Sequence, residues 1–463
     1  MVLLSDCTAG YSKAERPSLP VFGAAGSNGN RRAPAPALRA SARMRKRMRL
    51  HLAALAITLL LALAPAVSSQ EAAPQNGVDE EMLKQIDMMI RTMQIIRKNY
   101  VDIDKVSTAE LFQGAMQGMV RKLDPYSVFM EPTELKNFKE GMEGEFGGIG
   151  INMQVKDGKV IVLAVFSGTP AEKAGFKAGD MITAVDGALI TREDLDNMLK
   201  RLRGPVGSKV RVTLLRPGED NRSFEVEMER AIIETPSVVD AKVVDGTSIG
   251  YVRLLQFQEH TARDLEKVLR DFEGKKVSAI IMDLRGNPGG LLGTAIEVCS
   301  MFLPERKLVV TVRHHSDLHE NRESERFQEH FTKGGYKVPD NVGLMLLVDR
   351  NSASASEITA GCLRDYGRAV LLGTRTFGKG SVQNVIELGD GNAIKLTIAR
   401  YYTPDPKRPT IDKNGVSPDI TEEMSPAELS AVMTGVNRPD IERDRQFARA
   451  VQVLKSLSVL SRK

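Results

Sequence analysis

The sequence predicts a multi-domain α/β protein, and three observations support this prediction. At 463 residues the chain is too long for one compact core. Its composition, 42% hydrophobic and 27% charged, is typical of globular proteins. In the second half of the chain, apolar strands alternate with helical segments, as they do in α/β layers.

The first predicted boundary separates a leader, residues 1–69, from the rest of the chain. A basic stretch at 44–51 (MRKRMRLH) directly precedes an apolar run at 52–64, and small residues follow. This run is shorter than the roughly 20 apolar residues of a membrane-spanning helix and is typical of a signal peptide. We therefore expect cleavage after Ser68 and an exported, periplasmic protein, with an uncleaved leader anchored in the membrane as the alternative.

The formal net charge of +5 resides in this leader. The first 69 residues contain ten of the 64 Lys and Arg residues but two of the 59 Asp and Glu residues, so the remainder carries −3. The body therefore lacks a basic footprint, and no nucleic-acid partner is expected. Its two cysteines, Cys299 and Cys362, are too few for a disulfide scaffold, and two separate buried thiols are expected.

Residues 70–143 form a predicted helical region. Apolar residues recur at helical spacing over 79–100, and a second short helix fits 108–122, before Asp124-Pro125. Met and Ile side chains form the stripe of the first helix. Such a stripe is usually a packing surface, and a cofactor or partner surface is the alternative.

Residues 144–232 are predicted to form a small α+β module. Two alternating runs, at 151–155 and 159–165, are separated by Asp-Gly, a typical hairpin turn. A helical face at 191–202 and a strand at 209–215 complete the module.

The predicted α/β core, residues 233–425, precedes a helical C-terminal extension at 426–463. Strands at 277–284 and 341–349 each lead into a turn of small residues and then into a helix. The polar, charged stretch at 312–337 is expected to be an exposed excursion between core strands.

Two segments of the small module indicate a binding site. Glycines in EFGGIGI (145–151) let successive N–H groups turn toward an anion, although a tight turn explains them equally well. Together with SGTPAEKAGFKAGDMITAVDG (167–187), they closely resemble a PDZ domain. The resemblance implies a side-chain pocket beside the 191–202 helix and a peptide carboxylate bound by four N–H groups: Gly148, Ile149, Gly150 and Ile151.

Two turns of the predicted core suit catalysis. In DLRGNPGG (283–290), glycine N–H groups at a strand–helix turn are able to stabilise an oxyanion. In NSASASEI (351–358), small neighbours let a serine hydroxyl stand clear, and three serines compete for this role: Ser352, Ser354 and Ser356. Helix N-capping by a serine is the ordinary alternative.

A serine nucleophile needs a base, and the sequence offers histidines and a lysine. No motif surrounds the histidines after the leader, and no metal site is expected among them: His260, His314, His315, His319 and His330. Lys379 lies between two glycines in TFGKGSVQ (376–383). It is able to act as a base if burial lowers its pKa.

After the PDZ-like segment, the chain carries DLRGNPGG, NSASASEI and TFGKGSVQ in that order, and in this it resembles the C-terminal processing peptidases. DPYS (124–127) and NGVSPD (414–419) fit the same family. The resemblance implies a ClpP/crotonase-like protease core. It implies Ser354 as nucleophile, Lys379 as general base and Gln383 as the residue that orients the lysine. Gly289 or Gly290, with the N–H of Ala355, would form the oxyanion hole. The sequence departs from the family pattern at Asn351, where relatives often have glycine.

The expected function is that of a serine endopeptidase that recognises substrate C-termini through its PDZ domain and cleaves exported proteins near those ends. Expected partners are proteins with free, apolar C-termini, and a homo-oligomer or an adaptor protein is left open. No metal or organic cofactor is expected. A catalytically dead PDZ scaffold is a second hypothesis, against which the joint presence of Ser354, Lys379 and Gln383 argues. An acyl-CoA enzyme of the crotonase type is a third, and it leaves the leader and the PDZ-like module unexplained.

Overall fold

The computed structural model describes residues 80–156, 158–191, 201–218, 222–314, 327–425, 427–429, 432 and 443–460. These residues divide into two compact units, 80–111 and 112–460, and each is described by itself. The predicted leader lies outside the described residues. Within the described ranges, no helix has the length and apolar character needed to cross a membrane.

The first unit is helical. It contains α2 (Glu80–Asn99), a short 3₁₀ helix, η1 (Ile103–Lys105), and the start of α3 (Thr108–Arg121), so both predicted helices are confirmed. The stripe of α2 does not pack as expected, because none of its residues is buried. Met82 is 50% exposed and Met88 59% exposed.

The second unit begins with the rest of α3, a short strand and helix α4, and continues into the small module. The module is built on a sheet of order β3-β4-β5-β7-β8, with β6 paired to β5. The hairpin predicted at Asp157-Gly158 is confirmed, since Lys156 pairs antiparallel with Lys159. Residues 192–200 of the predicted helix lie outside the described part of the chain. The elements are β1 (Val128–Met130), α4 (Pro132–Glu143), β2 (Glu145–Gly148), β3 (Ile151–Lys156), β4 (Lys159–Val165), α5 (Pro170–Lys173), β5 (Met181–Val185), β6 (Ala188–Leu189), β7 (Lys209–Arg216), β8 (Arg222–Glu229) and β9 (Ala231–Glu234).

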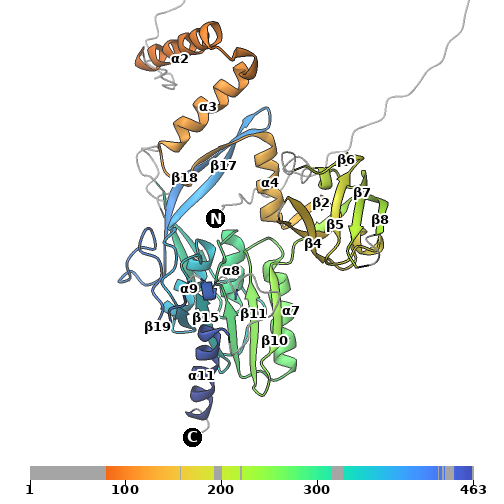
Figure 1. The fold of residues 1–463 in the computed structure, drawn as a ribbon. Coiled ribbons are helices and arrows are strands. Elements are labelled where there is room, and N and C mark those ends of the chain that lie inside the picture. Colours follow the sequence, from red (N-terminus) through yellow and green to blue (C-terminus); the bar gives the residue numbers. More distant parts are fainter. Residues whose placement is uncertain are drawn as a thin grey trace, which may run out of the picture. The chain divides into compact units, whose positions relative to one another are not determined.

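A six-stranded sheet, of order β10-β11-β12-β15-β16-β19, forms the centre of the α/β core. The strands from β11 onward are parallel, and β10 runs antiparallel at one edge. The strands are β10 (Val238–Val243), β11 (Ile249–Leu254), β12 (Ala279–Asp283), β15 (Gly343–Val348), β16 (Val370–Gly373) and β19 (Ile420–Thr421). The helices are α7 (Thr261–Gly274), α8 (Leu292–Ser300), α9 (Ala355–Asp365) and α11 (Arg445–Leu460), seen in Figure 1.

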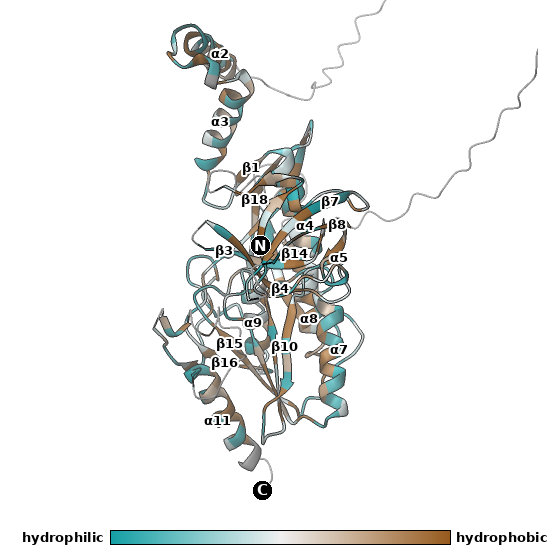
Figure 2. Ribbon diagram, turned by 45° about the vertical axis from the view of Figure 1, so that its right-hand side comes forward, coloured by the Kyte–Doolittle hydropathy of each residue, from teal (hydrophilic) through white to brown (hydrophobic). Residues whose placement is uncertain are grey.

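Helices cover both faces of this sheet because its strands are apolar on both sides. Along β12, Ile280 and Met282 pack in one cluster with side chains of α7, α8 and α9. The alternate residues Ala279 and Ile281 pack in a second cluster with α11. Figure 2 shows the resulting pattern, with brown strands inside and a largely teal α7 outside.

A second, antiparallel sheet has the order β1-β18-β13-β14, and β17 pairs with β18. Its later strands are β13 (Leu308–His314), β14 (Phe327–Phe331), β17 (Ser381–Gly389) and β18 (Asn392–Tyr402). The stretch at 312–337, expected to be an exposed excursion, contains the end of β13 and the whole of β14, which pair with each other. Most of β14 is nevertheless exposed. Its charged and polar side chains hide the strand from a period-based prediction.

The two cysteines are buried and free, as expected, but they are not separate. Cys299 lies on α8 and Cys362 on α9, and these two helices pack together. The neighbouring Cys299 thiol, together with burial, raises the pKa of Cys362. The Cys362 thiol is therefore held in the protonated, unreactive form.

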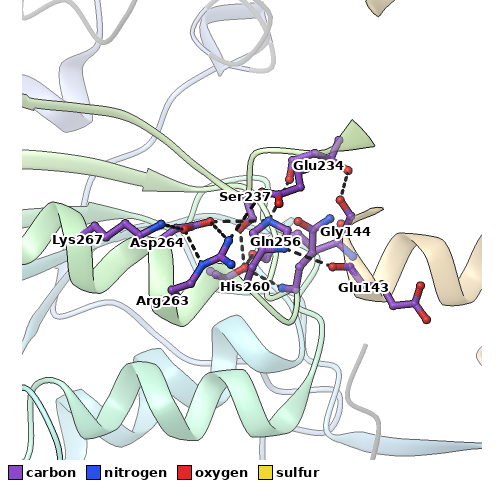
Figure 3. Close-up of polar contacts among 12 residues, drawn as sticks. Glu143, Gly144, Glu234, Ser237, Gln256, His260, Arg263, Asp264 and Lys267 are labelled. Carbon is purple, nitrogen blue, oxygen red and sulfur yellow. Dashed lines mark hydrogen bonds and ion pairs between the residues drawn. The ribbon is translucent and has the colours of Figure 1, made fainter. Parts of the chain in front are cut away.

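The segments that enter and leave the small module meet at a buried histidine. The carbonyl of Gly144 accepts hydrogen bonds from the N–H of Thr235 (2.7 Å) and from its hydroxyl (2.8 Å). His260, at the start of α7, lies against both segments: Nδ1 is 3.3 Å from Glu143 O and Nε2 is 3.2 Å from Thr235 O (Figure 3). Gly144 has a φ of 80°, and a Cβ there would lie 2.4 Å from the His260 ring. Glycine is therefore required at this crossing.

Candidate active site

The two glycine- and serine-rich turns meet at one edge of the central sheet. Strands β12 and β15 are parallel neighbours, with Asp283 opposite Leu347, so the loops that follow them emerge side by side. Asn287 joins these loops: its carbonyl accepts bonds from the N–H of Ala353 (3.0 Å) and the hydroxyl of Ser356 (3.0 Å). The sheet and this joint together fix the turn that carries the three serines.

Only one of these three serines has an uncommitted hydroxyl. Ser352 Oγ donates to Leu284 O (2.8 Å), and Ser356 Oγ donates to Asn287 O (3.0 Å). Ser354 Oγ is buried and has no hydrogen-bond partner. Its backbone is strained, with φ 57° and ψ −114° at the N-terminus of α9. A conformation of this kind costs about 1–3 kcal/mol and is concentrated at functional sites.

Glu357 connects this serine to the predicted base, and the sequence analysis missed it. Its fully buried carboxylate accepts hydrogen bonds through Oε2 from the N–H groups of both Ser354 (2.8 Å) and Lys379 (2.9 Å). Through Oε1 it accepts from the hydroxyl of Thr376 (2.6 Å) and the N–H of Gly378 (2.7 Å). One carboxylate therefore holds the main chains of Ser354 and Lys379 together. The pattern S-x-x-E at 354–357, typical of a helix capping box, was the available sequence signal.

Lys379 lies in an environment that disfavours its charged form. The residue is 8% exposed, and burial lowers its pKa from 10.5 to about 8. The charge of Lys395 acts in the same direction, while Glu357 and Asp124 oppose it. An amine that titrates near 8 is neutral in a useful fraction of molecules at physiological pH, as a general base must be.

The backbone on either side of Lys379 is tightly constrained. A Cβ at Gly380 would lie 2.4 Å from the backbone nitrogen of Asp412, so no larger residue fits there.

The Lys379 Nζ lies 4.9 Å from the centre of the Tyr126 ring, a residue that the sequence analysis also missed. Tyr126 belongs to the DPYS loop, where Asp124 accepts hydrogen bonds from the N–H groups of Tyr126 (2.7 Å) and Ser127 (2.8 Å).

Gln383 is buried on β17, the strand that begins two residues after Lys379. Its Nε2 donates to the hydroxyls of Ser381 (2.8 Å) and Thr397 (3.2 Å), while its Oε1 has no hydrogen-bond partner. The Gln383 amide is therefore fixed by its neighbours, with one acceptor left available. The structure contains no hydrogen bond that joins Gln383 to the Lys379 amine, and its orienting role stays a prediction.

The structure distinguishes the two glycines of the predicted oxyanion hole. The N–H of Gly289 is already committed to the side chain of Asn287 (2.9 Å). No acceptor for the N–H groups of Gly290 or Ala355 is found among the described residues. Gly290 has a φ of 151°, and a Cβ there would lie 2.0 Å from Phe257 O, so the turn requires glycine. Gly290 and Ala355 are the pair available to stabilise a developing oxyanion.

Hydrogen bonds and buried side chains within the small module hold the predicted carboxylate loop, residues 148–151, in place. The carbonyls of Ile149 and Gly150 accept hydrogen bonds from the N–H groups of Ala171 (2.9 Å) and Phe166 (2.9 Å). The side chains of Ile149 and Ile151 are buried in the module's core. Gly150 has a φ of 87°, and a Cβ there would lie 2.3 Å from Thr169. These bonds preform the loop between Gly148 and Ile151.

The described histidines lie apart from the serine turn. His260 is at the module junction, His314 ends β13 and His330 lies in β14, while His315 and His319 are outside the described residues. Across the ranges that the structure describes, no group of three or more His, Cys, Asp or Glu side chains could hold a metal ion.

Comparison with known proteins identifies the family and the domains of the chain. Residues 248–422 match the model of Peptidase family S41, residues 147–228 the PDZ domain and residues 58–133 the activating protease CtpB N-terminal domain. The chain is 35% identical over 385 residues to the carboxy-terminal processing protease CtpB of Bacillus subtilis, a match that covers 82% of this chain and 77% of the relative. It is 36% identical over 350 residues to the carboxy-terminal-processing protease of Bartonella bacilliformis, covering 75% and 77%. A solved photosystem II D1 C-terminal processing protease is 28% identical with a TM-score of 0.41, covering 75% of this chain and 94% of that chain.

Proposed function

The chain belongs to peptidase family S41, the carboxy-terminal processing proteases, and from this premise we propose that Ser354 is its nucleophile and Lys379 its general base. The observation that carries this assignment is the shared carboxylate. Both main-chain N–H groups donate to Glu357 Oε2, and of the three candidate serines Ser354 alone keeps an uncommitted hydroxyl.

The reaction then follows from the protonation states. Neutral Lys379 accepts the proton of Ser354 as Oγ attacks the scissile carbonyl, and the N–H groups of Gly290 and Ala355 stabilise the oxyanion. The Lys379 ammonium returns the proton to the leaving amine, which leaves an acyl-enzyme on Ser354. A water molecule, deprotonated by the same amine, hydrolyses this ester. Gln383 is proposed to orient the lysine through its unpartnered Oε1.

The PDZ domain supplies recognition. Members of this domain family bind an extended peptide as an added strand and hold its free carboxylate with backbone N–H groups. We propose that Gly148, Ile149, Gly150 and Ile151 provide these groups and that an apolar final residue enters the neighbouring pocket. Substrates are then cleaved near their C-terminal ends at Ser354.

Three serine variants test the catalytic assignment. Ser354→Ala removes a hydroxyl without a partner, so the variant is expected to fold and to lose peptide cleavage. Ser352→Ala and Ser356→Ala each break a buried hydrogen bond, which costs stability of about 1–3 kcal/mol but leaves turnover substantial. Cleavage of a peptide substrate and thermal unfolding are measured for all three. A folded Ser354→Ala enzyme that still cleaves peptides would reject the assignment, and a wild-type enzyme inert toward peptides and fluorophosphonates would favour the scaffold hypothesis.

Export to the periplasm is a separate proposal, supported by the basic and apolar segments of the leader. Fractionation of cells and N-terminal sequencing of the mature protein test it, with a soluble periplasmic chain beginning at Ser69 as the expected result. Recovery in the cytoplasmic fraction with an intact leader would contradict it. Recovery in the membrane with residues 44–69 intact would support the anchored alternative instead.

A further inference from the structure

A buried tyrosine lies beside the proposed nucleophile and has no structural use for its hydroxyl. Tyr401 is fully buried, and its Oη has no hydrogen-bond partner. Leaving a buried polar group unpaired costs about 1–3 kcal/mol, so phenylalanine would be the more stable residue at this position. The cost indicates that the hydroxyl has a role outside folding.

The main chain of Tyr401 is bonded next to Lys379. Its N–H donates to the carbonyl of Gly380 (2.9 Å), the residue after Lys379. On the other side of β18, it pairs with Val312 of β13. The strand is therefore fixed on both sides, and the ring is packed in the main core cluster. Ala355, the residue after Ser354, is buried in the same cluster, and the hydroxyls of Tyr401 and Ser354 are both buried without a hydrogen-bond partner.

The chemistry of the phenol decides which role it is able to take. Burial raises the pKa of Tyr401 well above 10, and the charges of Glu357 and Asp412 act in the same direction, so the group stays protonated. A protonated phenol is a hydrogen-bond donor that does not compete with Lys379 as a base. When Ser354 transfers its proton to Lys379, negative charge develops on Oγ, and a donor at this place stabilises and aims it.

We propose that Tyr401 is a positioning residue, whose hydroxyl donates a hydrogen bond to Ser354 Oγ in the reacting geometry. This bond occupies one lone pair of Oγ and directs the serine proton toward Lys379. The proton moves from Ser354 to Lys379, and Tyr401 keeps its own proton throughout. The proposal rests on the Ser354–Lys379 assignment above.

Tyr401→Phe tests this role, because it removes one oxygen and keeps the ring. We expect kcat to fall by about 10- to 100-fold, as misplacement of a reacting group does, with KM unchanged and a melting temperature equal to or above wild type. The rate of Ser354 labelling by a fluorophosphonate should fall by a similar factor. The pH at which activity rises should stay where it is in the wild-type enzyme, since Lys379 remains the base.

Tyr402→Phe is the matched control, because Tyr402 is the next residue of the same strand and is only partly buried. Its kcat and labelling rate should match those of the wild type. Tyr401→Phe with kcat within about twofold of wild type would overturn the proposal, while wild-type labelling at Ser354 would still support the nucleophile assignment. Loss of the pH-dependent rise in Tyr401→Phe would identify the phenol as the base and overturn the positioning role. Absence of labelling at Ser354 in the wild type would instead overturn the assignment on which the proposal rests.

Discussion

At the scale of single residues, the site depends on an amine that the protein makes difficult to charge. Lys379 is buried beside Tyr126 and near a second amine, Lys395, and both burial and the Lys395 charge lower its pKa to about 8. At pH 7 an amine with this pKa is neutral in roughly one molecule in ten, compared with far fewer than one in a thousand at the ordinary value. Burial and the charge of Lys395 therefore suit Lys379 to the proposed role of base.

The first prediction concerns pH. Because the neutral amine is the active form, kcat/KM should rise with pH through about 8 and be lost progressively below it. Lys395→Met removes a charge that lowers this pKa, so the rise should move to higher pH. Lys379→Arg should be inactive, since guanidinium is not deprotonated in proteins. The measurement is peptide cleavage from pH 6 to 10 with a non-ionising substrate, and a flat profile would show that Lys379 is not the base.

The sequence could not rank the three serines, because all three lie in the same turn and each has an alanine beside it. They differ in the hydrogen-bond acceptor of each hydroxyl. Two of these acceptors, the carbonyls of Leu284 and Asn287, lie almost 70 positions earlier in the chain. The family resemblance supplied the choice that local pattern could not. Tyr126 was also unpredictable from pattern, since the β1–β18 pairing places the DPYS loop beside a strand more than 250 residues away.

At the scale of elements, the active site is a joint between α9 and the loop that precedes β17, and Glu357 forms it. The glutamate belongs to the first turn of α9, where a negative charge is favoured by the helix dipole. Burial raises the pKa of Glu357, while hydrogen bonds from Thr376, Gly378, Ser354 and Lys379 counteract this effect. The four donors account for a buried carboxylate for which the described residues supply no salt bridge.

The second prediction is that Glu357→Gln weakens this joint and shifts the pH profile. A glutamine amide cannot accept at its nitrogen, so two of the four donors lose their acceptor, at a cost of about 1.5–3 kcal/mol for each charge-assisted bond. Maximal kcat should fall. The Glu357 charge raises the pKa of Lys379, so its removal should move the rise in activity to lower pH.

The control for this variant is Glu387→Gln, which neutralises an exposed glutamate of β17 that pairs with Lys139 at 2.6 Å. Exposed pairs contribute little, so its activity and unfolding temperature should stay close to wild type. Chemical denaturation and pH–rate profiles are measured for both variants. A Glu357→Gln enzyme with wild-type stability and an unshifted profile would contradict the role of the carboxylate as a joint.

The third prediction concerns the junction drawn in Figure 3. His260→Ala removes the ring whose two nitrogens lie within hydrogen-bond distance of Glu143 O and Thr235 O, so the paired segments should open more often. Hydrogen exchange of the Thr235 amide, which is bonded to Gly144 O, should accelerate by at least about tenfold, equivalent to about 1.4 kcal/mol. His314→Ala is the control, since His314 lies on β13. Equal exchange in wild type and His260→Ala would show that the ring does not hold the junction.

Secondary structure was predictable where an element carries a continuous run or a regular stripe of apolar residues. The strands at 277–284 and 341–349 and the helices that follow them were expected and are present as β12, β15, α8 and α9. No strand was expected at β14, whose residues are almost all exposed, because its strand conformation comes from pairing with β13. The prediction failed at α2, where a helix was correctly expected but its apolar stripe was wrongly assigned to packing.

At the scale of the whole molecule, the chain combines a recognition domain with a protease domain that cannot choose substrates by its dyad alone. A buried serine and lysine act on any peptide bond that reaches them, so selectivity has to come from binding elsewhere. A PDZ domain that reads a free C-terminus provides it, because each polypeptide has only one such end. The proposed carboxylate loop and the proposed dyad would thus act on one substrate.

The last prediction tests whether the PDZ domain selects substrates by their terminal carboxylate. Amidation of a peptide substrate removes the charge, and a charge-assisted hydrogen bond contributes about 1.5–3 kcal/mol, so kcat/KM should fall roughly 10- to 150-fold. Two alanine variants separate loop geometry from backbone strain. Gly150 (φ 87°) and Gly187 (φ 78°) both have left-handed backbones, but a Cβ collides with Thr169 only at Gly150, whereas Gly187 has nothing within 4 Å. Gly150→Ala should therefore lose the preference for acid over amide, and Gly187→Ala should keep it. Equal cleavage of acid and amide peptides by the wild-type enzyme would mean that selection does not depend on the carboxylate, even with an active dyad.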